Sequence, residues 1–137
     1  MLLTVKKIIL FICFLFVFSN SIALAAKITF PCTQMSGQHY ATFIIDMDKK
    51  IVFTGGKQFE FLKGSTDEIV KTASFIKKEE FTYSGMFFEF HLKDKIAFLS
   101  VKEKISKIDL LKAMKVDNSE KLFKSPDHSF TFFCGEE

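Results

Sequence analysis

Apolar and polar residues alternate in short runs along most of the chain after residue 26, and turn residues separate the runs. The clearest run is 86–92, where Met86, Phe88, Phe90 and Leu92 occupy every second position. Successive side chains of a strand point to opposite faces, so this period of two predicts strands with one apolar face. Further strands are predicted at residues 27–32, 39–47, 51–54, 57–62, 67–77, 80–83, 96–101, 121–124 and 129–134. For 67–77 a helix is the alternative, because Ile69, Ala73 and Ile76 also fit one helix face, but the β-branched residues favour a strand.

The period changes after residue 104, where the pattern favours a helix. Ser106 can cap a helix, and Asp109 stands three residues later, as in a capping box. Lys112 and Lys115 fall where the last turn would be, and cations there suit the helix dipole. The sequence therefore predicts one short helix over residues 107–115.

These elements predict a mainly β fold, a small antiparallel β-barrel or curled sheet of about eight strands with one short helix in the C-terminal half. Strands and helices do not alternate, which argues against a parallel α/β fold. The chain has 19 phenylalanines and no tryptophan. We expect Phe side chains to fill the interior of the barrel, and a cavity for a lipid or another ligand is the alternative.

The first 26 residues have the three zones of an export signal. Lys6 and Lys7 precede an unbroken apolar run over 8–18, and Ala23-Leu24-Ala25 offers small residues to signal peptidase. We predict a signal peptide at residues 1–25 and a single β-rich domain at 26–137, with an uncleaved membrane anchor as the alternative. The mature protein would be secreted or periplasmic, with membrane contact only through the signal before cleavage.

Two cysteines remain in the predicted mature domain, one near each end. Cys32 follows Ile28 and Phe30 at period two, and Cys134 follows Phe130 and Phe132 in the same way. Each cysteine should lie on the phenylalanine-bearing face of its strand, and an even pair in an exported chain indicates a disulfide. Without a Cys-x-x-Cys motif, a structural bond is favoured over a redox or metal pair.

Composition and motifs indicate no catalytic chemistry. Beyond the signal, 17 lysines face 16 acidic residues, and the chain has no arginine, which argues against a nucleic-acid partner. The histidines, His39, His91 and His128, are too scattered for a metal motif. The chain has neither a glycine-rich phosphate loop nor a Gly-x-Ser-x-Gly elbow. We predict no catalytic residue, no metal ligand and no cofactor, and hence a non-enzymatic protein.

Exposed aromatic residues are the remaining candidates for function. Ser84-Gly85 reads as a turn, and Phe87 falls on the otherwise polar face of the next strand. Tyr40 and Ile44 do the same on another strand. Aromatic side chains beside charges are typical of protein contacts, and burial under a loop or the helix is the alternative. The candidate contact loop comprises Ser84, Gly85, Phe87 and Phe88.

The layout resembles the C-type lysozyme inhibitors, small bacterial exported barrels with a cysteine near each end. Their inhibitory loop carries a Ser-Gly followed by an aromatic, and the stretch from Tyr83 to Phe88 is similar, with Phe88 in the tyrosine position. Their second, lysine-bearing loop has no counterpart that the sequence alone places. The lysine-only basic set and the many Phe and Ile residues also resemble exported effector candidates of host-associated bacteria.

The sequence therefore predicts an exported, non-enzymatic binding protein, an effector among the options, with a protein partner. An inhibitor of a secreted hydrolase such as lysozyme is one alternative, which the resemblance implies. A small carrier with a lipid or other ligand inside the barrel is the other.

Overall fold

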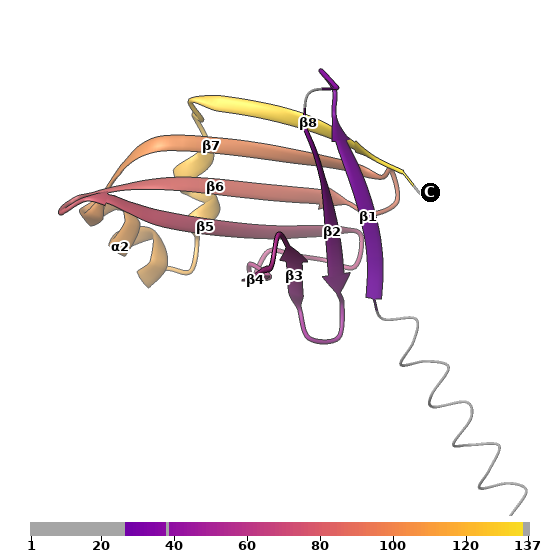
Figure 1. Cartoon of the computed structure of the whole chain (residues 1–137). Helices are drawn as coiled ribbons and strands as arrows, with labels where there is room; N and C mark the ends of the chain where they lie inside the picture. The colour runs from indigo at the N-terminus through magenta and orange to yellow at the C-terminus, as the bar shows by residue number, and fades with distance from the viewer. Residues whose placement is uncertain (1–26, 38, 136–137) are drawn as a thin grey trace, which may run out of the picture.

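The computed structural model describes residues 27–37 and 39–135 and shows a mainly β protein (Figure 1). The predicted signal peptide and its cleavage site after Ala25 lie outside the described residues. The elements in chain order are β1 (Lys27–Gln34), β2 (Tyr40–Asp46), β3 (Ile51–Thr54), β4 (Lys57–Glu60), β5 (Ile69–Glu79), β6 (Thr82–His91), β7 (Ile96–Ser106), α2 (Lys107–Lys115), the 3-10 helix η1 (Ser119–Phe123) and β8 (His128–Cys134).

The eight strands of the described region form one antiparallel sheet in the order β4-β3-β2-β1-β8-β7-β6-β5. The first and last strands are therefore neighbours inside the sheet, and its two edges are β4 and β5. The sheet curls until these edges approach each other, and the Leu62 N–H, just after β4, donates to the Lys71 carbonyl of β5 at 2.8 Å. The result is a nearly closed barrel, as predicted; the gap between β4 and β5 is called the seam below.

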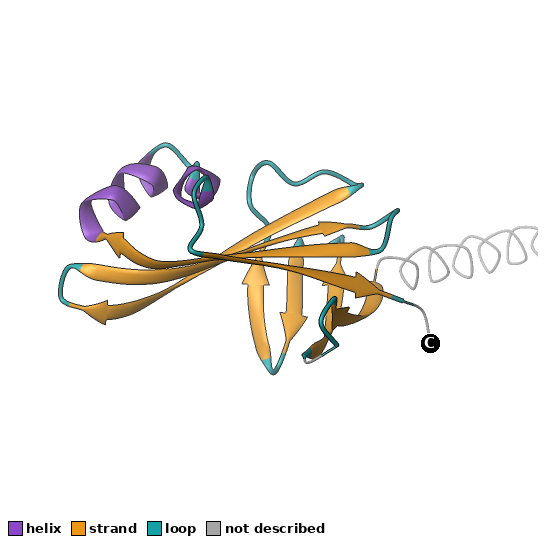
Figure 2. Ribbon diagram, turned by 90° about the horizontal axis from the view of Figure 1, so that it is seen from above, coloured by secondary structure: helices purple, strands orange, loops and turns teal. Residues whose placement is uncertain are grey.

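Strands β5 to β7 are the long ones, with 10 or 11 residues each, and they cross the shorter strands β1 to β3 at a steep angle (Figure 1). Viewed from above, β1 to β3 lie on one side of the long strands, and α2 lies on the other side at the opposite end (Figure 2). The two faces of the long strands therefore support separate cores.

The predicted disulfide is present. Cys32 of β1 pairs directly with Cys134 of β8, and the two sulfur atoms are 2.03 Å apart. Both cysteines are buried in the barrel core. The bond joins the two ends of the domain, and a disulfide is consistent with an oxidising compartment.

Phenylalanine rings fill the core inside the barrel, as the composition predicts. The ring of Phe43 packs edge-on against Phe90, with centroids 4.9 Å apart, and against Phe88 at 5.3 Å. Phe30 and Phe132 belong to the same core, beside the disulfide. Inward residues alternate with outward ones along most strands, and the inward side chains pack together in one core.

A second core lies on the outer face of the long strands, beneath α2 and η1. It consists of Phe87, Ile105, Leu110 and Phe123. The Phe87 and Phe123 rings stack with centroids 5.5 Å apart. The helix spans Lys107–Lys115 as predicted, and the Ser106 side chain accepts a hydrogen bond from the Asp109 N–H at 3.1 Å.

Two local predictions are wrong. The predicted strand at 121–124 is part of η1, whose Phe123 side chain is needed to cover Phe87. The predicted turn at Ser84-Gly85 is part of the continuous strand β6. The chain instead turns at residues 80–81, which were predicted to begin a strand over 80–83. Gly85 allows Ile105 and Phe123 to pack closely against β6, because a Cβ at this position would lie 2.8 Å from Ile105 Cδ1 and 2.9 Å from Phe123 Cζ.

Candidate binding surface

The predicted contact loop at Ser84, Gly85, Phe87 and Phe88 is not a loop, and its two aromatic rings do not share a surface. Phe87 is only 5% exposed and faces η1 on the outer side of the sheet. Phe88 points into the barrel, where it packs against Phe43. Because neighbouring residues of a strand face opposite ways, one protein partner could not contact both rings. The four residues therefore lie in strand β6, and the hydrolase-inhibitor alternative stays a prediction from the sequence.

The other predicted exposed residues do lie at the surface. Tyr40 is 82% exposed at the start of β2, and Ile44 is partly exposed on the same face of that strand. Phe43 and Ile45, which alternate with these residues along β2, face inward and are buried. Tyr40 therefore contributes almost nothing to the core, and its side chain is free for contact with another molecule.

The sheet register extends from Tyr40 to further exposed apolar side chains. Tyr40 pairs with Thr33 of β1, and Thr33 pairs on its other side with Phe133 of β8. Neighbouring strands are about 4.8 Å apart, so Tyr40 and Phe133 flank a small threonine within about 10 Å. Phe133 is 52% exposed.

A parallel row of residues lies directly beside the first. The Met35 N–H donates to the Thr131 carbonyl of β8 at 2.9 Å, and Thr131 pairs with Phe98 of β7. Met35 and Phe98 are both exposed. Tyr40, Phe98 and Phe133 thus lie around two threonines on one sheet face, Met35 is exposed in the turn directly after β1, and we call these four residues the outer-face patch.

Polar groups border this patch and hold part of it in place. The His91 ring packs edge-on against Phe98, with ring centroids 5.2 Å apart. The His91 Nε2 atom in turn lies 3.1 Å from Glu89 Oε1. An apolar centre with a polar rim is the usual composition of a protein interface.

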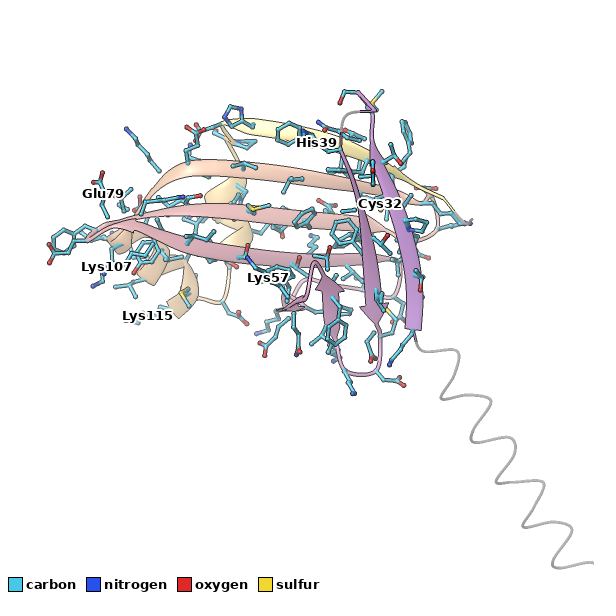
Figure 3. The ribbon with its side chains drawn as sticks, in the orientation of Figure 1. Cys32, His39, Lys57, Glu79, Lys107 and Lys115 are labelled. Carbon is cyan, nitrogen blue, oxygen red and sulfur yellow. A yellow bond between two sulfur atoms is a disulfide. The ribbon has the colours of Figure 1, made fainter. Side chains whose placement is uncertain are left out.

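The disulfide lies directly beneath the patch. Cys32 precedes Thr33, and Cys134 follows Phe133, so the covalent bond joins the two strands at the level of these side chains. Strand backbones with a cross-link need little ordering on binding, which lowers the entropic cost of association. The side-chain view shows this region where β1 and β8 meet, above the Cys32 label (Figure 3).

Sequence reasoning missed Phe98 and Phe133, although a signal for both existed. Phe132 and Phe133 are adjacent in a strand, so both cannot face the core. Once Phe132 and Cys134 are placed inward, Phe133 must point outward. Phe98 stands between the buried residues Ala97 and Leu99 and follows the same rule.

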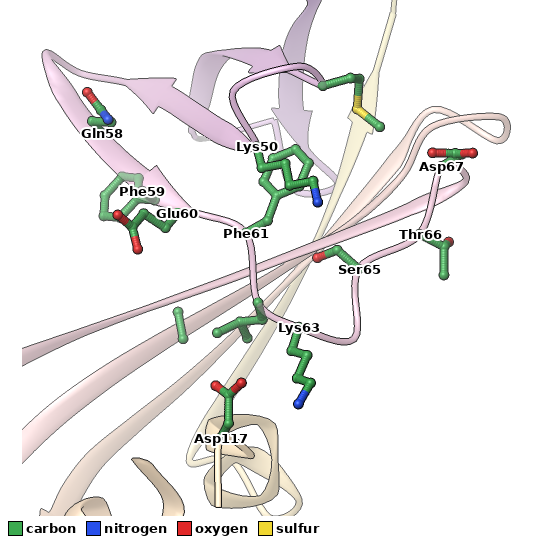
Figure 4. A pocket seen from close by; sticks show the side chains of 13 residues that line it. Lys50, Gln58, Phe59, Glu60, Phe61, Lys63, Ser65, Thr66, Asp67 and Asp117 are labelled. Atoms are coloured by element: carbon green, nitrogen blue, oxygen red, sulfur yellow. The ribbon is translucent and has the colours of Figure 1, made fainter. Parts of the chain in front are cut away.

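A hollow lies at the seam between β4 and β5, apart from the outer-face patch (Figure 4). This open crevice has a volume of about 770 Å³, and its lining includes Lys50, Phe59, Glu60, Phe61 and Asp117. The carrier hypothesis placed a ligand inside the barrel, but phenylalanine rings occupy that space. The crevice is outside the core and carries charged groups of both signs.

Within residues 27–37 and 39–135, no group of three or more His, Cys, Asp or Glu residues could hold a metal ion. In the same part of the chain, no helix is both long enough and apolar enough to span a membrane. His91 and His128 each lie next to a glutamate, the latter 2.9 Å from Glu103 Oε1.

Neither a protein-family model, nor a curated protein, nor a solved structure matches this chain. The resemblances to lysozyme inhibitors and to exported effectors stay predictions from the sequence.

Proposed function

We propose that the protein is an exported, non-enzymatic binding protein that holds a protein partner on the outer-face patch. The observation that carries this proposal is the cluster of exposed Tyr40, Phe98 and Phe133 on one sheet face, with exposed Met35 in the adjoining turn. Single exposed apolar residues are ordinary on a protein surface, whereas a cluster with a polar rim is typical of an interaction site. Tyrosine, phenylalanine and methionine are also enriched in interfaces.

Export is supported by the three-zone signal in residues 1–25 and by the disulfide between Cys32 and Cys134. An oxidising compartment would keep this bond intact, and the bond in turn holds the strands that carry the patch. Amino-terminal sequencing of the exported protein should give a chain that begins at Ala26. A bulk product that retains Met1 would remove the export argument.

The direct test is affinity capture with oxidised residues 26–137, comparing the wild-type protein with two variants. Tyr40→Ala and Phe133→Ala should each weaken binding of the captured partner by about 2 kcal/mol or more, roughly 30-fold, as for interface anchors. The control is Leu111→Ala, on the exposed face of α2 at the other end of the molecule. Partner binding that is unchanged by Tyr40→Ala and Phe133→Ala would contradict the proposal.

A further inference from the structure

A separate cluster of exposed apolar residues lies at the end of the molecule farthest from β1 to β3 (Figure 1). Phe81 occupies the tip of the β5–β6 hairpin and is 64% exposed. The Lys107 N–H, at the start of α2, donates to the Phe81 carbonyl at 2.8 Å, and the Lys107 Nζ atom lies 5.9 Å from the Phe81 ring centroid. The hairpin tip and the helix therefore form one continuous surface.

The helix contributes an apolar stripe to this surface. Leu110 and Ala113 face the sheet and are buried. Ile108, Leu111 and Met114 recur every third residue outside this buried pair, and each is more than half exposed. These three side chains are not part of the core beneath the helix, to which Leu110 belongs. We call Phe81, Ile108, Leu111 and Met114 the distal patch.

Positive charge accompanies the helical part of the distal patch, whereas at the hairpin tip Lys77 and Lys78 are balanced by Glu79 and Glu80 beside Phe81. The helix carries Lys107, Lys112 and Lys115 against a single acidic residue, Asp109. Lys107 and Lys115 stand at its two ends (Figure 3). At 100° per residue, Lys112 and Lys115 lie on the same side as Ile108 and Leu111. Lysine stems can lie along apolar surface while their ammonium groups reach a neighbouring anion.

The charge and shape of the distal patch select one class of partner. A second copy of the chain would bring two lysine-rich helices together, so self-association is disfavoured. The patch is formed by a hairpin tip and an exposed helix face, so it protrudes and cannot enclose a small ligand. The exposed apolar side chains and the neighbouring lysines call for a surface that accepts apolar groups and carries negative charge. The interface of an anionic bilayer has this composition.

We propose that the distal patch binds the surface of anionic lipid bilayers. Phe81, Ile108, Leu111 and Met114 would enter the boundary between headgroups and acyl chains, while the lysines contact lipid phosphates. Nine helical residues provide only a shallow and reversible attachment. This inference is independent of the proposed protein partner, since the outer-face patch lies on β2, β7, β8 and the turn after β1. It also differs from the expectation that the mature domain has no membrane contact.

The test is co-sedimentation of oxidised residues 26–137 with vesicles of phosphatidylcholine alone or of phosphatidylcholine mixed with phosphatidylglycerol. The wild-type protein should bind the anionic vesicles several-fold better, and added salt should reduce this binding. Lys112→Gln and Lys115→Gln should each lower the partition coefficient about fivefold, the typical effect of one basic residue near such a surface. Leu111→Asp should reduce binding to the level of neutral vesicles.

Phe133→Ala serves as the matched control, because it removes an exposed aromatic ring from the outer-face patch and should leave vesicle binding unchanged. Leu111 is 56% exposed, so Leu111→Asp should fold, which an unchanged melting temperature would verify. Equal binding to both vesicle types, or anionic binding that survives Leu111→Asp and both lysine variants, would overturn the proposal. Loss of a captured protein partner by the same variants, without any vesicle binding, would assign the distal patch to that protein instead.

Discussion

Phe87 and Phe88 are neighbours in the chain, yet they belong to two different cores. Phe88 packs inside the barrel, and Phe87 packs beneath η1. Alternation along the strand predicts that the two rings face opposite ways. The alternation does not show which outward-facing residues are covered by a segment that comes later in the chain. Phe87 is covered by Phe123, which lies 36 positions further along the chain. That long-range contact is why the burial of Phe87 escaped prediction.

Replacement of Phe87 by alanine tests its burial. Phe87→Ala should lower the free energy of unfolding by about 3–5 kcal/mol, because the truncation leaves a cavity against Phe123. Urea denaturation measures the change. The control is Phe133→Ala on the outer-face patch, which should cost about 1 kcal/mol or less. Similar small losses for both variants would show that Phe87 is exposed in solution.

Gly85 has a role that its turn-like sequence context hides. A methyl group at this position would meet Ile105 and Phe123 at less than 3 Å. Gly85→Ala should therefore destabilise the protein by about 1–3 kcal/mol through overpacking. Gly64→Ala is the matched control, since the nearest atoms to its added Cβ are 3.9 Å away. Equal melting temperatures for the two variants would argue against close packing of η1 on β6.

At the scale of elements, the helix was the most predictable part and the 3-10 helix the least. Helix α2 is specified locally, by the Ser106 cap and by lysines in its last turn. Segment η1 has no side-chain hydrogen bond at its start, and its conformation depends on the contact of Phe123 with the sheet. The hairpin turn was misplaced for a related reason. The pairing of β5 with β6 continues through Ser84 and overrides the turn preference of Ser-Gly.

The cap predicts a measurable loss of stability. Ser106→Ala removes the acceptor of the Asp109 N–H and should reduce the free energy of unfolding by about 1 kcal/mol. Thermal unfolding provides the measurement. Ser106→Asp should restore most of the loss, since aspartate is also a good cap. An unchanged melting temperature in Ser106→Ala would mean that packing of Leu110 and Ala113 alone fixes the helix.

At the scale of the whole molecule, the curled antiparallel sheet and the pairing of its terminal strands followed from alternation and from the cysteines. The position of the seam did not, because no local signal marks β4 and β5 as edges. The outer-face patch was predicted only in part, through Tyr40. The other residues of the patch are brought near Tyr40 by the strand order, in which β1 lies between β2 and β8.

The disulfide should dominate the stability of the whole domain. The closed loop of roughly 100 residues predicts about 4–5 kcal/mol of stabilisation in the chain-entropy model. The Cys32→Ser, Cys134→Ser double variant should show this loss in urea unfolding, and its effect should match that of reduction in the wild-type protein. A loss below about 1 kcal/mol would mean that the sheet closes equally well without the bond.

The most direct test of the central claim is site-specific photo-crosslinking from the outer-face patch. Benzoylphenylalanine replaces Phe133 in one variant and Leu111 in a second variant. Each oxidised variant is mixed with the extract from which the partner was captured, and the mixture is irradiated. Phe133 is half exposed, so the larger ring can be accommodated without disturbing the core. We expect one discrete protein adduct from position 133 and none from position 111. An adduct from position 111 alone, or equal labelling at both positions, would contradict the assignment of the partner to this patch.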